Sequence, residues 1–191
     1  MIGEFTGTPQ GFRAEVDGHD RRLLDRLLGE ILTVLVEPSE LTSLVRATTG
    51  FESSRPEPES PALDNLLPPM SEDPPEAAEL RALTEDFLRA EKSARLRRVR
   101  RDLRSAHRDT GGVVVVPPCS VWDWLAALND LRLALAGELG IEDAADAERV
   151  WDQAHDEDAD ARLGLASGLY VAVTWWQDSL LRAVRSGVPE H

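Results

Sequence analysis

The strongest chemical signal in the sequence is a run of seven arginines, with Asp102 as the only acid among them: Arg95, Arg97, Arg98, Arg100, Arg101, Arg104 and Arg108. At helical spacing, four of these side chains share one face: Arg97, Arg101, Arg104 and Arg108. Such a face can bind a phosphate backbone or an acidic protein surface. The alternative is a solvated face whose arginines pair with the chain's own 35 acidic residues. The residues that we expect to bind DNA or a partner are Arg95, Arg97, Arg98, Arg101, Arg104 and Arg108.

Cys119 is the only cysteine in the chain, which excludes an internal disulfide and a cysteine-rich zinc site. It stands at a predicted helix start, where the helix dipole favours the thiolate form of a cysteine. A cysteine nucleophile also needs a base, and no histidine follows Cys119 within the predicted helix. Cys119 is our candidate for redox sensing or an intermolecular disulfide; the alternative is an inert thiol in the core.

An acidic stretch after His155 imitates the start of a calcium loop, with carboxylates at Asp156, Asp158 and Asp160. The position that needs glycine is Ala161, however, and the position of the closing glutamate is Ser167. His155 has no second histidine three or four residues away, as a zinc site on a helix would require. We therefore predict no metal site. An enzyme or a metal-dependent protein built around His155 and the acidic loop stays as the weaker alternative.

Motifs for nucleotide, dinucleotide, serine-hydrolase and zinc chemistry are all missing, so we predict a non-enzyme with no catalytic residues and no cofactor. The formal net charge of −14 repels a nucleic-acid backbone, which leaves a local patch as the only route to DNA. The N-terminus resembles no secretory signal and no apolar run is long enough to span a membrane, so we expect a cytoplasmic protein.

The hydrophobic periodicity predicts one all-α domain over residues 1–191, an irregular bundle of about six helices. The expected helices cover residues 20–37, 39–50, 76–107, 120–139, 144–154 and 166–184. Residues 1–19 alternate weakly between glycines and predict a short hairpin. The valine run at 113–116 is interpreted as an extended connector in which one strand can form. Residues 51–75 hold seven prolines and predict a mobile linker without a helix, in which Leu63, Leu66 and Leu67 are the residues that can be ordered.

Two apolar patterns bear on packing. The helix over 76–107 is expected to bury one stripe in its first half and another in its second: Leu80, Leu83, Phe87, Ala90 and Ala94, then Leu96, Val99, Leu103 and Ala106. In the last helix, Trp175 and Trp176 point about 100° apart, so one can fill the core while the other meets a partner. This predicts a homodimer interface at Trp175 and Trp176.

Three stretches of the chain resemble a known family: Asp73 to Arg98, Trp124 to Leu135 followed by Glu138 to Ile141, and Leu169 to Leu180. The second contains a Leu-Asn-Asp-Leu-Arg-Leu-Ala-Leu string after a Trp-Leu pair, and the third contains Trp175-Trp176-Gln177-Asp178. They are similar to an actinobacterial family, formerly described as a domain of unknown function, whose members include the oxidative-stress regulators called AosR.

The resemblance implies a helical cytoplasmic regulator, encoded near the ClpS adaptor and cysteine-biosynthesis genes. Its implied partners are an RNA polymerase sigma factor and promoter DNA. Redox control in this family resembles a switch built from two nearby cysteines, which this chain cannot form because it has only Cys119. The alternative function is a protein-interaction adaptor that never contacts DNA.

Overall fold

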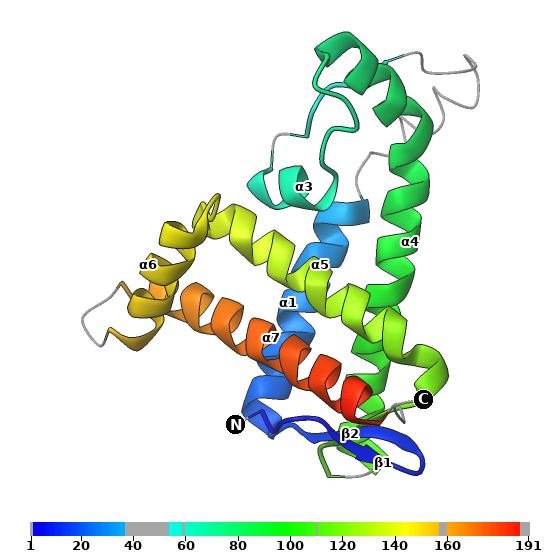
Figure 1. Ribbon diagram of the computed structural model, residues 1–191, viewed down its shortest axis with the longest axis vertical. Coiled ribbons are helices and arrows are strands. Elements are labelled where there is room, and N and C mark those ends of the chain that lie inside the picture. The colour runs from blue at the N-terminus through cyan, green and yellow to red at the C-terminus, as the bar shows by residue number, and fades with distance from the viewer. Residues whose placement is uncertain (1, 37–53, 59, 110, 157–159, 188–191) are drawn as a thin grey trace.

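The computed structural model describes residues 2–36, 54–58, 60–109, 111–156 and 160–187. Within these residues the chain forms six α-helices and a three-stranded antiparallel sheet (Figure 1). The helices are α1 (Gly18–Val36), α3 (Pro61–Leu66), α4 (Pro74–Asp109), α5 (Val121–Leu139), α6 (Ala144–His155) and α7 (Ala161–Ser186). The predicted all-α bundle with an N-terminal hairpin is confirmed. None of these described helices is long and apolar enough to cross a membrane.

The N-terminal hairpin gains a third strand from the valine run. Strand β1 (Thr6–Thr8) pairs with β2 (Gly11–Glu15), and β2 pairs with β3 (Val113–Val116). Val114 and Val116 are buried, whereas Val115 between them is 40% exposed, as the alternation of a half-buried strand requires. The sheet closes one end of the helical body, beside the C-terminal end of α7 (Figure 1).

Helices α1 and α4 pack side by side, and both lie close to their predicted ranges. Asp17 caps α1, because its carboxylate accepts from the backbone N–H groups of His19 and Asp20 at 2.8 and 2.9 Å. The apolar residues of α1 extend beyond one face, and Leu24, Leu28 and Leu35 are almost fully buried. This central position matches the wide stripe of the sequence.

The first half of α4 departs from the predicted packing. Leu83 and Phe87 are each 67% exposed, and the buried face carries Arg81 and Glu85 instead. These charges can be buried because they are paired: Arg89 Nε donates to Glu85 Oε1 at 2.7 Å and Arg81 donates to the carbonyl oxygen of Leu67 at 3.1 Å. The predicted stripe through Leu83 and Phe87 is therefore wrong, whereas Leu96, Val99, Leu103 and Ala106 are buried as expected.

The proline-rich segment contains a helix that the sequence did not predict. Helix α3 begins with a proline at its first turn, where the missing N–H costs nothing. It packs on α5, and this close approach depends on Gly137, because a Cβ there would lie 2.1 Å from the carbonyl oxygen of Pro61. The expectation of no helix is wrong at Pro61–Leu66 because Ala62, Leu63 and Leu66 are buried. The helix expected at 39–50 lies outside the described residues.

An aromatic cluster joins the sheet end to α5 and α7. Trp176 stacks on Phe5 at a ring distance of 5.0 Å and meets the edge of Trp124 at 5.8 Å. Trp124 donates its Nε1–H to Asp102 Oδ2 of α4 at 3.0 Å. Trp176 is fully buried, as predicted for one member of the pair, and Trp175 is 39% exposed. The partner contact expected of the exposed tryptophan stays a prediction.

Candidate binding groove between α1 and α4

The arginine-rich half of α4 forms one wall of an open groove of about 570 Å³ against α1. The groove is lined by Gly29, Leu32 and Thr33 from α1 and by Arg97, Arg100, Arg101 and Arg104 from α4. We call these seven residues the basic groove. Four guanidinium groups over a short length of helix create a positive field that favours anions, although the chain as a whole carries a net charge of −14.

Asp25 of α1 holds two of the four arginines. Arg104 donates from Nε to Oδ1 at 2.6 Å and from Nη2 to Oδ2 at 2.9 Å, and Arg100 donates from Nε to Oδ1 at 3.0 Å. The hydrogen bond from Arg104 is the main cause that lowers the pKa of Asp25 to about 2; burial opposes it and Arg100 adds to it. Asp25 thus stays ionised and holds the side chains of Arg100 and Arg104 against α1.

Gly29 gives Arg100 the room to lie against α1. A Cβ on Gly29 would stand 2.9 Å from Arg100 Nη2 and 3.2 Å from its Cζ. The side chain of Arg100 can therefore lie across the helix surface to reach Asp25, one turn before Gly29. Two residues that set the shape of the groove, Asp25 and Gly29, thus come from a helix about 75 positions earlier in the sequence than the arginines.

The arginines that were predicted as binding residues fall into three groups. Arg97 and Arg101 lie in the basic groove, are exposed, and make no ion pair within the described part of the chain. Arg104 lies in the same groove but is held by Asp25. Arg95 pairs with Glu91 at 2.7 Å, and Arg98 pairs with Asp123 of α5, so both lie outside the groove. The side chain of Arg108 is not among those described.

Arg100 belongs to the groove although the prediction omitted it as a binding residue. The spacing of the arginines could have identified Arg100 as a groove residue, because Arg100 and Arg104 stand four residues apart, as do Arg97 and Arg101. The two pairs form the two rows of the groove wall. The sequence does not show where Asp25 lies. Its position neutralises Arg100 and Arg104 and leaves Arg97 and Arg101 unpaired among the described residues.

The remaining candidates lie elsewhere. Cys119 is exposed in the turn Pro118–Ser120 before α5, so the alternative of a core thiol is wrong. His155 Nδ1 lies 2.8 Å from the carbonyl oxygen of Trp151, and the two rings are 5.0 Å apart. Asp160 caps α7 by accepting from the N–H groups of Arg162 and Leu163. Among the described residues, no group of three His, Cys, Asp or Glu side chains could hold a metal ion.

Comparison with known proteins adds one finding. No curated protein and no solved structure matches the chain. One family model, described as a domain of unknown function (DUF2017), matches residues 2–184, which is nearly the whole sequence. The chain therefore belongs to the DUF2017 family.

Proposed function

We propose that this protein is a non-enzymatic, cytoplasmic regulator of transcription under oxidative stress that acts by binding an acidic segment of an RNA polymerase sigma factor in the basic groove. The single observation that carries the choice of surface is the pair Arg97 and Arg101, which are exposed and have no ion-pair partner in the described residues. The process and the kind of partner come from the resemblance to the AosR family set out above.

The groove suits a protein segment better than a bare phosphate chain. Leu32 and Thr33 line it together with the arginines, so an occupant meets an apolar and a hydroxyl contact as well as charge. The net charge of −14 also opposes a long nucleic-acid duplex far more than a short acidic peptide, because a duplex extends well beyond the groove. An acidic partner other than a sigma factor would make the protein an adaptor without DNA contact.

Promoter DNA is the second candidate partner. Arg97 and Arg101 stand four residues apart on one exposed helix face, and guanidinium groups are strong donors to phosphate oxygens. DNA contact would have to be confined to this patch. It would also show the steep dependence on salt that follows from the release of counterions.

The test compares two double variants of equal charge. Arg97→Ala with Arg101→Ala removes the unpaired arginines of the groove, whereas Arg182→Ala with Arg185→Ala removes two exposed arginines of α7. We measure binding to a stress sigma factor, to a mixed-sequence duplex, and to both together, at two salt concentrations. The groove variant should lose about tenfold in affinity, since an exposed charge contact is worth up to about 1 kcal/mol.

The outcomes separate the candidates. Loss of sigma-factor binding in the groove variant alone supports the proposal. Salt-sensitive duplex binding that only the groove variant loses makes DNA the partner instead. Equal behaviour of the two double variants would mean that the basic groove is not the binding surface, and the proposal would be dropped.

A further inference from the structure

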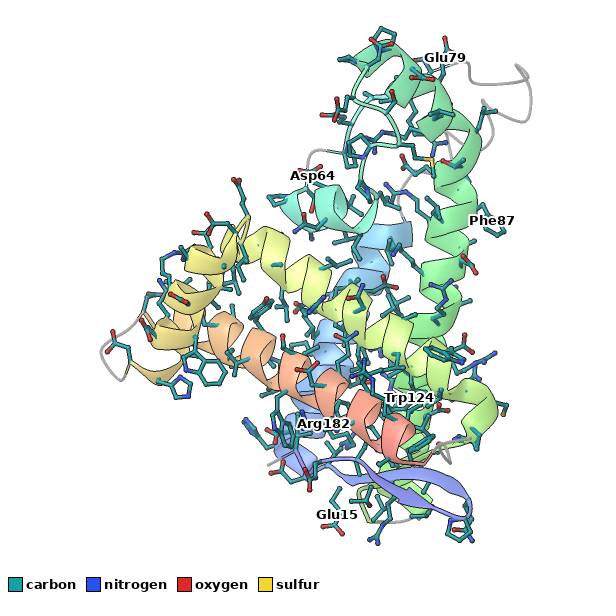
Figure 2. All side chains as sticks on the ribbon, in the orientation of Figure 1. Glu15, Asp64, Glu79, Phe87, Trp124 and Arg182 are labelled. Atoms are coloured by element: carbon teal, nitrogen blue, oxygen red, sulfur yellow. The ribbon has the colours of Figure 1, made fainter. Side chains whose placement is uncertain are left out.

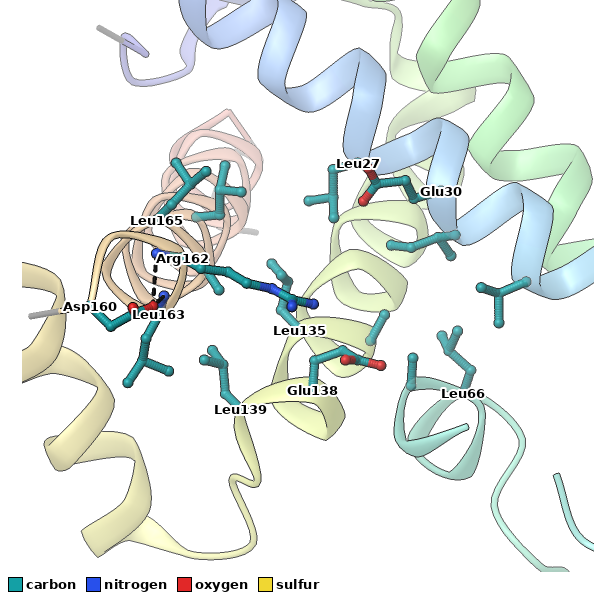
Figure 3. Close-up of a pocket in the computed structure, with 16 residues that line it drawn as sticks. Leu27, Glu30, Leu66, Leu135, Glu138, Leu139, Asp160, Arg162, Leu163 and Leu165 are labelled. Atoms are coloured by element: carbon teal, nitrogen blue, oxygen red, sulfur yellow. Dashed lines mark hydrogen bonds between the residues drawn. The ribbon is translucent and has the colours of Figure 1, made fainter. Parts of the chain in front are cut away.

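A second groove, of opposite character, is lined by α1 and α7, and α3 and α5 also line its larger hollow. It consists of two hollows of about 480 and 370 Å³ that share Leu165 and Leu169 of α7. Figure 3 shows the larger hollow, with Leu27 and Glu30 on one side and the start of α7 on the other. We call the two hollows together the apolar groove. It is independent of the basic groove, which lies against α4.

Large apolar side chains line this groove and remain in contact with water. Leu165 is 51% exposed, Trp175 is 39% exposed and Leu163 is 37% exposed. All three come from α7 and face the space beside α1. Single exposed apolar residues are ordinary, but several of them that line one concave surface are typical of an interaction site.

The shape of the groove fits a helix. On α1 its lining runs from Asp20 in the smaller hollow to Val34 in the larger one, a length of about 21 Å at 1.5 Å per residue. On α7 the lining includes the small residues Gly164, Gly168 and Ala172, spaced by one helical turn. A Cβ on Gly168 would meet nothing within 4 Å, so the backbone of an occupant can approach closely there. A small molecule would fill only part of this length.

The charged residues at the mouth of the groove indicate which charges a bound helix should carry on its flanks. Glu30 and Glu138 are exposed and line the larger hollow, and neither carboxylate is paired within the described residues. Figure 3 shows Arg162 extended from the start of α7 toward Leu135 and Glu138. Asp160 is already used as the cap of α7. The two free carboxylates outnumber the one guanidinium, so basic groups on the occupant are favoured.

We propose that the apolar groove docks an amphipathic helix of a partner protein, with an apolar face seated between α1 and α7 and lysines or arginines along its flanks. This is the helix-in-groove mode of recognition, in which apolar anchors at three- and four-residue spacing supply affinity and flanking charges supply direction. A second copy of this chain is a poorer occupant, because two molecules with a net charge of −14 each repel one another.

The probe is a labelled synthetic helical peptide with leucines at every third and fourth position and lysines on both flanks. A matched peptide carries glutamates in place of the lysines, and a saturated fatty acid serves as an apolar competitor. The lysine peptide should bind saturably, one per chain, and at least about tenfold more tightly than the glutamate peptide, because the mouth is acidic. Equal affinity for the two peptides, or complete displacement by the fatty acid alone, would overturn the proposal.

One variant blocks the groove without disturbing the fold. Gly168→Leu places a side chain in the open space beside α7 and also removes a poor helix former, so α7 should be retained. Ala145→Leu on the exposed surface of α6 is the matched control. We expect Gly168→Leu to lose at least about tenfold in affinity for the lysine peptide, since it fills the site of the apolar anchors. Unchanged binding, with helicity intact by circular dichroism, would contradict the proposal.

A charge reversal tests the flanks separately. Glu30→Lys with Glu138→Lys should reverse the preference between the two peptides, whereas Glu79→Lys with Glu148→Lys changes the net charge equally at sites away from the groove and should not. Figure 2 shows Glu79 at the far end of α4. The same proteins are examined by sedimentation. A dimer that only Gly168→Leu abolishes would make a second copy the occupant and would overturn the proposal.

Discussion

The two grooves lie on two flanks of one helix and differ in almost every physical property. On α1, Gly29, Leu32 and Thr33 face the arginines of α4, whereas Leu27, Ile31 and Val34 face the space beside α7. The first groove is basic and held by ion pairs to Asp25; the second is apolar with two free carboxylates at its mouth. A single helix can thus serve two surfaces when its apolar residues extend beyond one face.

The two grooves should respond to different conditions, because different interactions hold their walls in place. Charges hold the basic groove in shape, so acid and salt weaken it. Buried apolar side chains hold the walls of the apolar groove in place, so the shape of this groove depends on the packing of the core. Substitutions on α1 can therefore be chosen to change ligand affinity in both grooves, in one groove, or in neither.

The largest effect is expected from a change that both grooves share. Leu28 of α1 is fully buried between the flanks, and Leu28→Ala should lower the free energy of unfolding by about 2–5 kcal/mol, because it leaves a cavity. Both grooves should lose ligand affinity together. Urea denaturation measures the stability, and Leu83→Ala, at a residue that is 67% exposed and lines neither groove, is the control with a much smaller loss. Loss of binding in one groove alone would show that α1 is not a shared wall.

Most of the scaffold behind this comparison could be predicted from the sequence. Hydrophobic periodicity predicted α1, α4, α5, α6 and α7, and buried apolar residues recur at helical spacing along α1, α5 and the second half of α4. It failed where burial depends on partners distant in the sequence. Arg81 and Glu85 are buried and Leu83 and Phe87 are exposed, since the charges find their partners in each other, in Arg89 and in the Leu67 carbonyl. The Arg81–Glu85 and Arg89–Glu85 pairs are four residues apart and follow from helical spacing. The Leu67 carbonyl oxygen and Arg55, whose Nη1 lies 3.4 Å from Glu85 Oε1, lie outside this helix, so the periodicity of the helix could not predict these contacts.

Only the arginines of the candidate site could be predicted from the sequence. The shared face of Arg97, Arg101 and Arg104 follows from helical spacing alone, and the structure brings these three together. The neutralising Asp25 and the small Gly29 stand on α1, and nothing in the sequence places α1 beside this part of α4. The exposed Trp175 was expected at an interface, but the groove that it lines forms only because α1 and α7 both pack on α5, which the sequence does not show.

A change at Asp25 should affect the basic groove alone. Asp25→Asn removes the negative charge and one of the two acceptor oxygens that hold Arg100 and Arg104, and should cost about 1 kcal/mol of stability at neutral pH. This is less than the full pKa shift would give, because the groove is open to water. It also frees two guanidinium groups, so affinity for an acidic peptide should rise about threefold, a gain in line with an exposed charge contact. The apolar groove should bind its lysine peptide as before.

The pH dependence of the same variant has a defined sign. The pKa of Asp25 is lowered from 3.8 to about 2 in the folded protein, so its contribution is complete above pH 3.8 and is lost as the pH falls through about 2. The stability difference between the wild type and Asp25→Asn should therefore be constant at neutral pH and shrink between about pH 4 and pH 2. Asp178→Asn, on the exposed surface of α7, serves as a control. A difference that does not change with pH would mean that the ion pairs do not form in solution.

The smallest effect is expected at Cys119, which lies in the turn before α5 and in neither groove. Cys119→Ser should change the free energy of unfolding by less than about 0.5 kcal/mol, because the residue is exposed, and both affinities should stay the same. A single cysteine can sense an oxidant only as a sulfenic acid or through a disulfide with another molecule. Binding in each groove is therefore measured before and after mild peroxide, in wild type and in Cys119→Ser. If oxidation changes the affinity of one groove in wild type only, Cys119 is coupled to that groove, and the two surfaces differ in redox response as well as in charge.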